Sequence, residues 1–120
     1  MRKLAVLFFL SLASIAIHAE KFSYHVKSVT TILNGRDVKT QPKSMIIVVD
    51  TDNSTVSIDG KQYKIVSSAW GKYPETYFYV KGNGNQKSQL LIDYKYNHII
   101  LDSRNGFAEK YNFHKSSVNP

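Results

Sequence analysis

TVSIDGKQYKIV, residues 55–66, gives the clearest indication of how this chain folds. Its central dipeptide, Asp59-Gly60, is favoured in the two-residue type I′ turns of β-hairpins. Such a turn sets Val56 opposite Tyr63 and gathers the apolar side chains of both strands on one face: Val56, Ile58, Tyr63 and Ile65. Because a slip of one residue would expose this whole set to water, we predict an antiparallel hairpin with a firm register.

A second hairpin is predicted around Asn34-Gly35, another dipeptide suited to a type I′ turn. A two-residue turn here would pair Leu33 with Arg36 and Thr31 with Val38. The strand that leads into this turn changes parity, because its apolar residues first occupy even and later odd positions: Phe22, Tyr24, Val26, then Val29 and Leu33. A β-bulge produces such a change, so we predict a bent first strand of the kind that helps a sheet to close.

The remaining apolar runs are short, rich in β-branched and aromatic residues, and separated by polar segments: 45–49, 76–81, 89–96, 98–102 and 107–113. Within 89–96, alternation places Tyr94 and Tyr96 on the same face as Leu90 and Ile92. No stretch after residue 20 shows a helical period. We therefore predict an all-β fold, an antiparallel meander of about eight strands that forms a small barrel or a strongly curved sheet. This strand number and order resemble those of small lipocalin-like barrels, although the Gly–Trp motif near the start of lipocalins is missing.

The N-terminal segment has the three-part pattern of a secretory signal peptide. Residues 1–19, MRKLAVLFFLSLASIAIHA, contain two basic residues, an apolar run and a small residue at a cleavage position, Ala19, with a cut after Ala16 as the alternative. We predict a single all-β domain at 20–120 in a secreted or periplasmic protein, with no membrane span after cleavage. Removing Arg2 and Lys3 leaves 14 of the 16 Lys and Arg residues against 9 acidic residues, so the net charge falls from +7 to +5. Since the chain has no cysteine, the domain must be stable without disulfide bonds.

Residue types that carry catalysis or bind metals form no recognisable pattern in this sequence. The histidines of the predicted domain lie in separate strands, and no Gly-x-Ser-x-Gly motif occurs. We therefore expect no catalytic residue, no metal site and no cofactor, and the alternative is a small hydrolase built from serines or acidic residues. The basic residues are scattered rather than gathered into a run, so we expect no nucleic-acid partner.

Aromatic residues are the main candidates for a binding site. Several tyrosines that converge inside a barrel would offer apolar walls and hydroxyl groups to a small amphipathic ligand. The predicted ligand-binding residues are Tyr24, Tyr63, Trp70, Phe78, Tyr94, Tyr96 and Tyr111. On this interpretation the protein binds and holds such a ligand.

The alternative interpretation is a protein-binding module, such as an inhibitor or accessory factor of a secreted or envelope protein. Tyr77 and Tyr79 have the parity opposite to that of Phe78, and the only tryptophan lies nearby in the irregular segment 67–75. Exposed aromatic residues of this kind often form the centre of a protein interface. The predicted partner patch is Trp70, Tyr73, Tyr77 and Tyr79. The same segment could instead place Trp70 as a plug over one end of the barrel.

Overall fold

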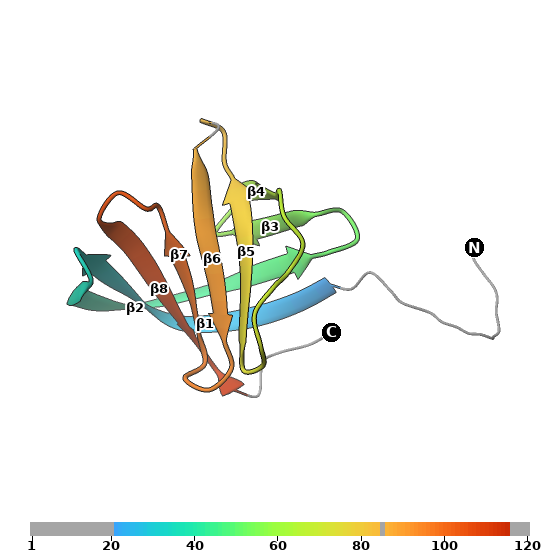
Figure 1. Ribbon diagram of the computed structural model, residues 1–120. Helices are drawn as coiled ribbons and strands as arrows, with labels where there is room; N and C mark the ends of the chain where they lie inside the picture. Colours follow the sequence, from blue (N-terminus) through green and yellow to red (C-terminus); the bar gives the residue numbers. More distant parts are fainter. Residues whose placement is uncertain (1–20, 85, 116–120) are drawn as a thin grey trace.

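The computed structural model describes residues 21–84 and 86–115, which form a closed antiparallel barrel of eight strands (Figure 1). The strands are β1 (Lys21–Leu33), β2 (Arg36–Asp50), β3 (Thr55–Ile58), β4 (Lys61–Ile65), β5 (Glu75–Lys81), β6 (Lys87–Asp93), β7 (His98–Asp102) and β8 (Phe107–Phe113). The all-β prediction is confirmed, and closure selects the barrel over the open curved sheet. The predicted signal peptide, 1–19, lies outside the described residues.

Each strand pairs with the next one along the chain, and β8 returns to pair with β1. The pairing is uneven around the barrel. β4 and β5 share only two register pairs, Lys64 with Lys81 and Ile65 with Val80, whereas β5 and β6 pair along their whole length. The long connection 66–74 separates these two strands. The β4–β5 seam is therefore the least paired part of the wall.

The hairpin at residues 55–66 has the predicted register. Val56 pairs with Tyr63, and Asp59 and Gly60 have φ values of 50° and 83°, as a type I′ turn requires. In the first hairpin, Leu33 pairs with Arg36 as predicted, but the predicted pairing of Thr31 with Val38 is wrong. Thr31 pairs with Lys39, because a register shift between Thr31 and Ile32 leaves Val38 as an extra residue.

The predicted bulge in the first strand is confirmed. The register of β1 against β8 shifts between Val26 and Ser28, so Lys27 has no counterpart on β8. Before the shift, even-numbered residues such as Tyr24 and Val26 are buried in the core, and after it Val29 packs against the core from an odd position. One extra residue thus bends the strand and lets both of its halves face the interior.

The predicted strand 89–96 is too long. β6 ends at Asp93, whose carboxylate accepts hydrogen bonds from the amides of Lys95 and Tyr96 at 2.8 and 3.3 Å. These bonds close a turn that passes through Asn97, which has a φ of 55°. Tyr96 therefore leaves the inner face and is 64% exposed.

The interior of the barrel is filled by apolar side chains contributed by all eight strands. The end at which β1 begins is closed by three aromatic rings, Tyr24, Tyr94 and Phe113. The hydroxyl groups of Tyr24 and Tyr94 share a hydrogen bond of 2.6 Å, and burial raises the pKa of Tyr24 far above its ordinary range. In the described part of the chain, no helix has the length and apolar character needed to cross a membrane.

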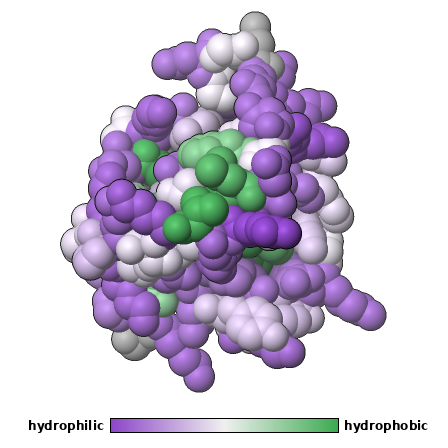
Figure 2. Space-filling view, turned by 90° about the vertical axis from the view of Figure 1, so that its left-hand side faces the viewer, coloured by the Kyte–Doolittle hydropathy of each residue, from purple (hydrophilic) through white to green (hydrophobic). Residues whose placement is uncertain are grey.

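One side of the barrel carries exposed apolar residues near the tips of two hairpins. Leu33 and Phe107 pair across β1 and β8, and both are exposed, as is Val38. The two turns touch, since the amide of Asn34 donates a hydrogen bond of 2.7 Å to the carbonyl of Gly106. Figure 2 shows the apolar surface gathered near the centre of this side and surrounded by hydrophilic residues.

Candidate binding surfaces

The connection between β4 and β5 holds Trp70 against the outside of the barrel. Trp70 and Tyr77 form an isolated antiparallel bridge, with hydrogen bonds from each amide to the other's carbonyl at 3.1 and 2.8 Å. Gly71 follows with a φ of 107°, and a Cβ atom there would lie only 2.9 Å from the carbonyl oxygen of Glu75. The idea of Trp70 as a plug is wrong, because its ring packs on Tyr77 and Tyr79, which face away from the core.

Three aromatic side chains meet at this place, and we call Trp70, Tyr77 and Tyr79 the outer aromatic cluster. The Trp70 ring stacks on Tyr77 with ring centroids 5.8 Å apart, and its centroid lies 4.9 Å from that of the Tyr79 ring. Two cations lie over Tyr79, with Lys87 Nζ 5.4 Å and Arg104 Cζ 5.5 Å from its centroid. The Trp70 side chain remains accessible, since the residue is 40% exposed.

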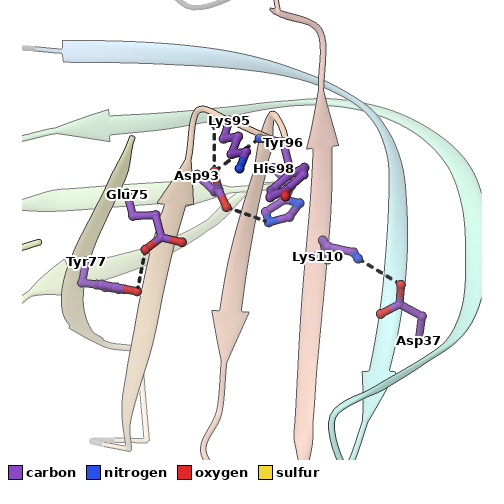
Figure 3. Close-up of polar contacts among 8 residues, drawn as sticks. All are labelled: Asp37, Glu75, Tyr77, Asp93, Lys95, Tyr96, His98 and Lys110. Carbon is purple, nitrogen blue, oxygen red and sulfur yellow. Dashed lines mark hydrogen bonds and ion pairs between the residues drawn. The ribbon is translucent and has the colours of Figure 1, made fainter. Parts of the chain in front are cut away.

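Several polar contacts lie on the strands beside this cluster (Figure 3). The Tyr77 hydroxyl donates to the Glu75 carboxylate at 3.2 Å, and this bond raises the pKa of Tyr77. Further along the sheet, Asp93 lies 3.7 Å from His98, and Lys110 pairs with Asp37 at 2.9 Å (Figure 3). Burial lowers the pKa of His98, which outweighs the opposite effect of Asp93.

Tyr73, the fourth predicted member of the partner patch, does not join the outer aromatic cluster. Its ring stacks on Tyr94 with centroids 5.9 Å apart, and it is 81% exposed. The structure therefore brings together three of the four residues predicted for this patch and places the fourth near the aromatic end of the barrel.

A row of lysines crosses the outer face of the barrel beside the outer aromatic cluster. Lys64 pairs with Lys81 in β5, and Lys81 pairs with Lys87 in β6, so three cationic side chains occupy neighbouring strands. We call these residues the lysine row. The lysine ion pairs among the described residues are those of Lys43 with Asp59 and of Lys110 with Asp37, and neither includes the lysine row.

The open end of the barrel contains cavities lined by both tyrosine and polar side chains. A cavity of about 510 Å³ lies between the β3–β4 turn and the β5–β6 loop, with Tyr63, Ser88 and Leu101 in its lining. A second, of about 270 Å³, is lined by Tyr63, Tyr111 and Glu109 among others. The Tyr111 hydroxyl donates to Glu109 at 2.7 Å, and burial with this bond raises the pKa of Tyr111.

The seven residues predicted to bind a ligand do not share one cavity. Tyr63 and Tyr111 lie at the open end, whereas Tyr24 and Tyr94 close the opposite end and Phe78 is part of the filled core. Trp70 and Tyr96 lie outside the barrel: Trp70 packs on the outward-facing Tyr77, and Tyr96 stacks on His98 in the β6–β7 region. The placement of Tyr96 on an inner wall is therefore wrong, because a turn follows Asp93 where continued strand alternation was assumed. Trp70 lies in the predicted irregular segment, but its ring packs on the outside of the barrel and not in the interior.

The charged groups of the barrel form no metal site within residues 21–84 and 86–115, since no three His, Cys, Asp or Glu side chains there could hold an ion. The lysine row escaped the sequence-based prediction. The row forms because β4 pairs with β5 across a long connection, and the alternation of either strand alone does not reveal that pairing.

Comparison of the chain with protein-family models, with curated proteins and with solved structures gives no significant match.

Proposed function

We propose that the protein is a secreted or periplasmic binding module that engages another protein through the outer aromatic cluster. The observation that carries this proposal is the fixed, accessible ring of Trp70, which two backbone hydrogen bonds hold on the outside of β5. Trp, Tyr and Arg are the residue types that contribute most to protein interfaces, and all three types meet here. An inhibitor or an accessory factor of a secreted or envelope protein has a function of this kind.

The rigidity of the cluster supports the same proposal. Two backbone bonds, a stacked ring and two cations restrain these side chains before any partner arrives. Binding then requires little further loss of side-chain entropy, which otherwise weakens an interface by about 0.5–1.5 kcal/mol for each immobilised side chain. Away from its open end, the barrel interior is packed with apolar side chains, which also favours a site on the outer surface.

Native mass spectrometry of the protein purified from its own host tests this function. We expect a complex with a second protein at fixed stoichiometry, lost in Trp70→Ala. Tyr96→Ala is the matched control, because Tyr96 is an exposed aromatic residue outside the cluster, and it should leave the complex intact. A complex that survives Trp70→Ala would contradict the proposal.

A small amphipathic ligand is the second candidate function, and the cavities at the open end favour it. Tyr63 and Leu101 offer apolar contacts there, while Gln86 and Ser88 add polar groups. The same native spectra would then show a small bound mass that Tyr63→Ala releases and Trp70→Ala retains. Absence of any small bound mass would leave the outer surface as the functional one.

Export is part of the proposal and rests on the N-terminal sequence. We expect the intact mass of the exported protein to correspond to Glu20–Pro120, the product of cleavage after Ala19. A mass that includes residues 1–19 would contradict cleavage at this position.

A further inference from the structure

We propose that the partner segment bound beside the outer aromatic cluster is an acidic peptide, whose carboxylates lie along the lysine row. This inference rests on the proposed function and adds the chemistry of the partner. Neighbouring strands lie about 4.8 Å apart, so Lys64, Lys81 and Lys87 present three positive charges in close succession. Like charges placed opposite one another across strands destabilise a sheet, and an acidic ligand would remove that penalty.

The local charge balance supports an anionic ligand. Arg104 adds a fourth cation beside the row, since its guanidinium lies over the same Tyr79 ring as Lys87. The nearby carboxylate of Asp102 accepts a hydrogen bond from the backbone amide of Arg104 at 2.8 Å. Among the described residues, no carboxylate forms an ion pair with any of these four cations.

The geometry suits an extended peptide. Every second side chain of an extended peptide points the same way, about 6.7 Å apart, which flexible lysine side chains on adjacent strands can reach. A peptide crossing β4, β5 and β6 in this way would lay its backbone beside Trp70 and Tyr79. The aromatic rings then provide apolar contact, and the cations provide charge-assisted hydrogen bonds.

Nucleic acid is less well suited to this surface, although aromatic and basic residues occur together. Single-stranded bases need free ring faces on which to stack. Here Trp70 and Tyr77 stack on each other with an interplanar angle of 21°, and the Tyr79 ring is contacted by Trp70 and two cations. Each of these rings therefore already has at least one aromatic or cationic neighbour from the protein itself. Carboxylates need only the cations, which remain unpaired with acids.

Fluorescence anisotropy with a labelled peptide of twelve glutamates tests the inference on the exported protein. We expect binding that weakens as NaCl rises from about 50 to about 200 mM, because the contacts are ionic. The variant Lys64→Gln/Lys81→Gln/Lys87→Gln should bind about tenfold or more weakly. The matched control, Lys21→Gln/Lys27→Gln/Lys39→Gln, removes the same charge from exposed positions outside the row and should stay within about twofold of the unmodified protein.

Two outcomes would overturn the acidic-peptide assignment. Equal weakening in both triple variants would mean attraction to overall charge, and tighter binding of an oligothymidine of the same length would point to nucleic acid. Native mass spectra of the complex with the partner protein distinguish a failure of this inference from a failure of the proposed function. If the complex survives in the lysine-row variant but is lost in Trp70→Ala, the acidic partner is wrong and the protein-binding function stands. If Trp70→Ala has no effect, the protein-binding function itself is wrong.

Discussion

At the residue scale, several turns depend on backbone conformations that few residues adopt readily. Asn34, Asp59 and Asn97 have φ values between 50° and 55°, where Asn and Asp are tolerated better than other non-glycine residues. Gly60, with a φ of 83°, completes the turn that sets the register of β3 and β4. That turn is therefore sensitive to a single β-branched substitution.

Gly60→Val should lower the free energy of unfolding by about 1–3 kcal/mol. No atom lies within 4 Å of a Cβ placed there, so the penalty comes from the positive φ and not from a clash. Gly84→Val is the control, because Gly84 also faces open space but has no such φ, and it should change stability by less than about 0.5 kcal/mol. Urea denaturation measures both, and equal effects would refute the conformational explanation.

His98 should make the barrel less stable in mild acid. Burial lowers its pKa in the folded state, so below about pH 6.5 the unfolded chain takes up a proton that the native state resists. The free energy of unfolding should therefore fall as the pH decreases from about 7.5 to about 5.5. His98→Gln should reduce that fall, whereas the exposed control His25→Gln should preserve it. An unchanged pH dependence in His98→Gln would show that other groups are responsible.

At the scale of elements, the connection between β4 and β5 determines where the outer aromatic cluster forms. Its backbone returns toward β5, pairs Trp70 with Tyr77 and also joins Val66 to Tyr79 through a hydrogen bond of 2.9 Å. The close approach of Gly71 to the Glu75 carbonyl maintains this path. The cluster therefore depends on an irregular segment as much as on the strand beneath it.

Gly71→Ala should disrupt the cluster while leaving the barrel folded. The added methyl group would lie 2.9 Å from a backbone oxygen at a φ of 107°, so the segment must shift. Trp70 is the only tryptophan, and its fluorescence should report a more solvated ring through a red-shifted emission. Far-ultraviolet circular dichroism should stay unchanged. Unshifted tryptophan emission would show that the bridge tolerates the substitution.

Strand register can be predicted from the sequence where local signals agree, but not where tertiary contacts determine it. At 55–66, turn chemistry and alternation agree, so register and inner face are both correct. At 89–96, alternation continues into Tyr94 and Tyr96 although the Asp93 carboxylate ends the strand, so the predicted face of Tyr96 is wrong. The pairing of Trp70 with Tyr77, like the alignment of the lysine row, depends on tertiary contacts across a long connection. Such contacts cannot be predicted from the local pattern of residues along one strand.

At the scale of the whole molecule, the chain carries an excess of positive charge. It has no cysteine, so no disulfide bond counters the destabilising effect of that charge. The net charge of the 120-residue sequence is +7, and three of its lysines lie side by side on neighbouring strands. Repulsion of this kind destabilises a compact state and is screened by salt. The overall stability should therefore depend on ionic strength, and the lysine row should account for much of that dependence.

Raising NaCl from about 20 to about 300 mM should increase the free energy of unfolding by about 0.5–1 kcal/mol. Lys64→Gln/Lys81→Gln/Lys87→Gln should be more stable than the unmodified protein at low salt and should respond less to salt. The control Lys21→Gln/Lys27→Gln/Lys39→Gln should keep most of the response. Thermal denaturation at both salt concentrations measures the effect, and a salt response that persists in the lysine-row variant would contradict this explanation.

The return of β8 to β1 also has a consequence for the order in which the protein folds. All other pairings join strands that follow one another along the chain, so they can form one hairpin at a time as the chain lengthens. The pairing of Ser28 with Asn112 joins opposite ends of the domain and must wait for the last strand. Until Phe107–Phe113 is available, β1 and β7 each have an unpaired edge open to other chains. A pause in synthesis that delays those final residues would therefore prolong the period in which this protein can aggregate.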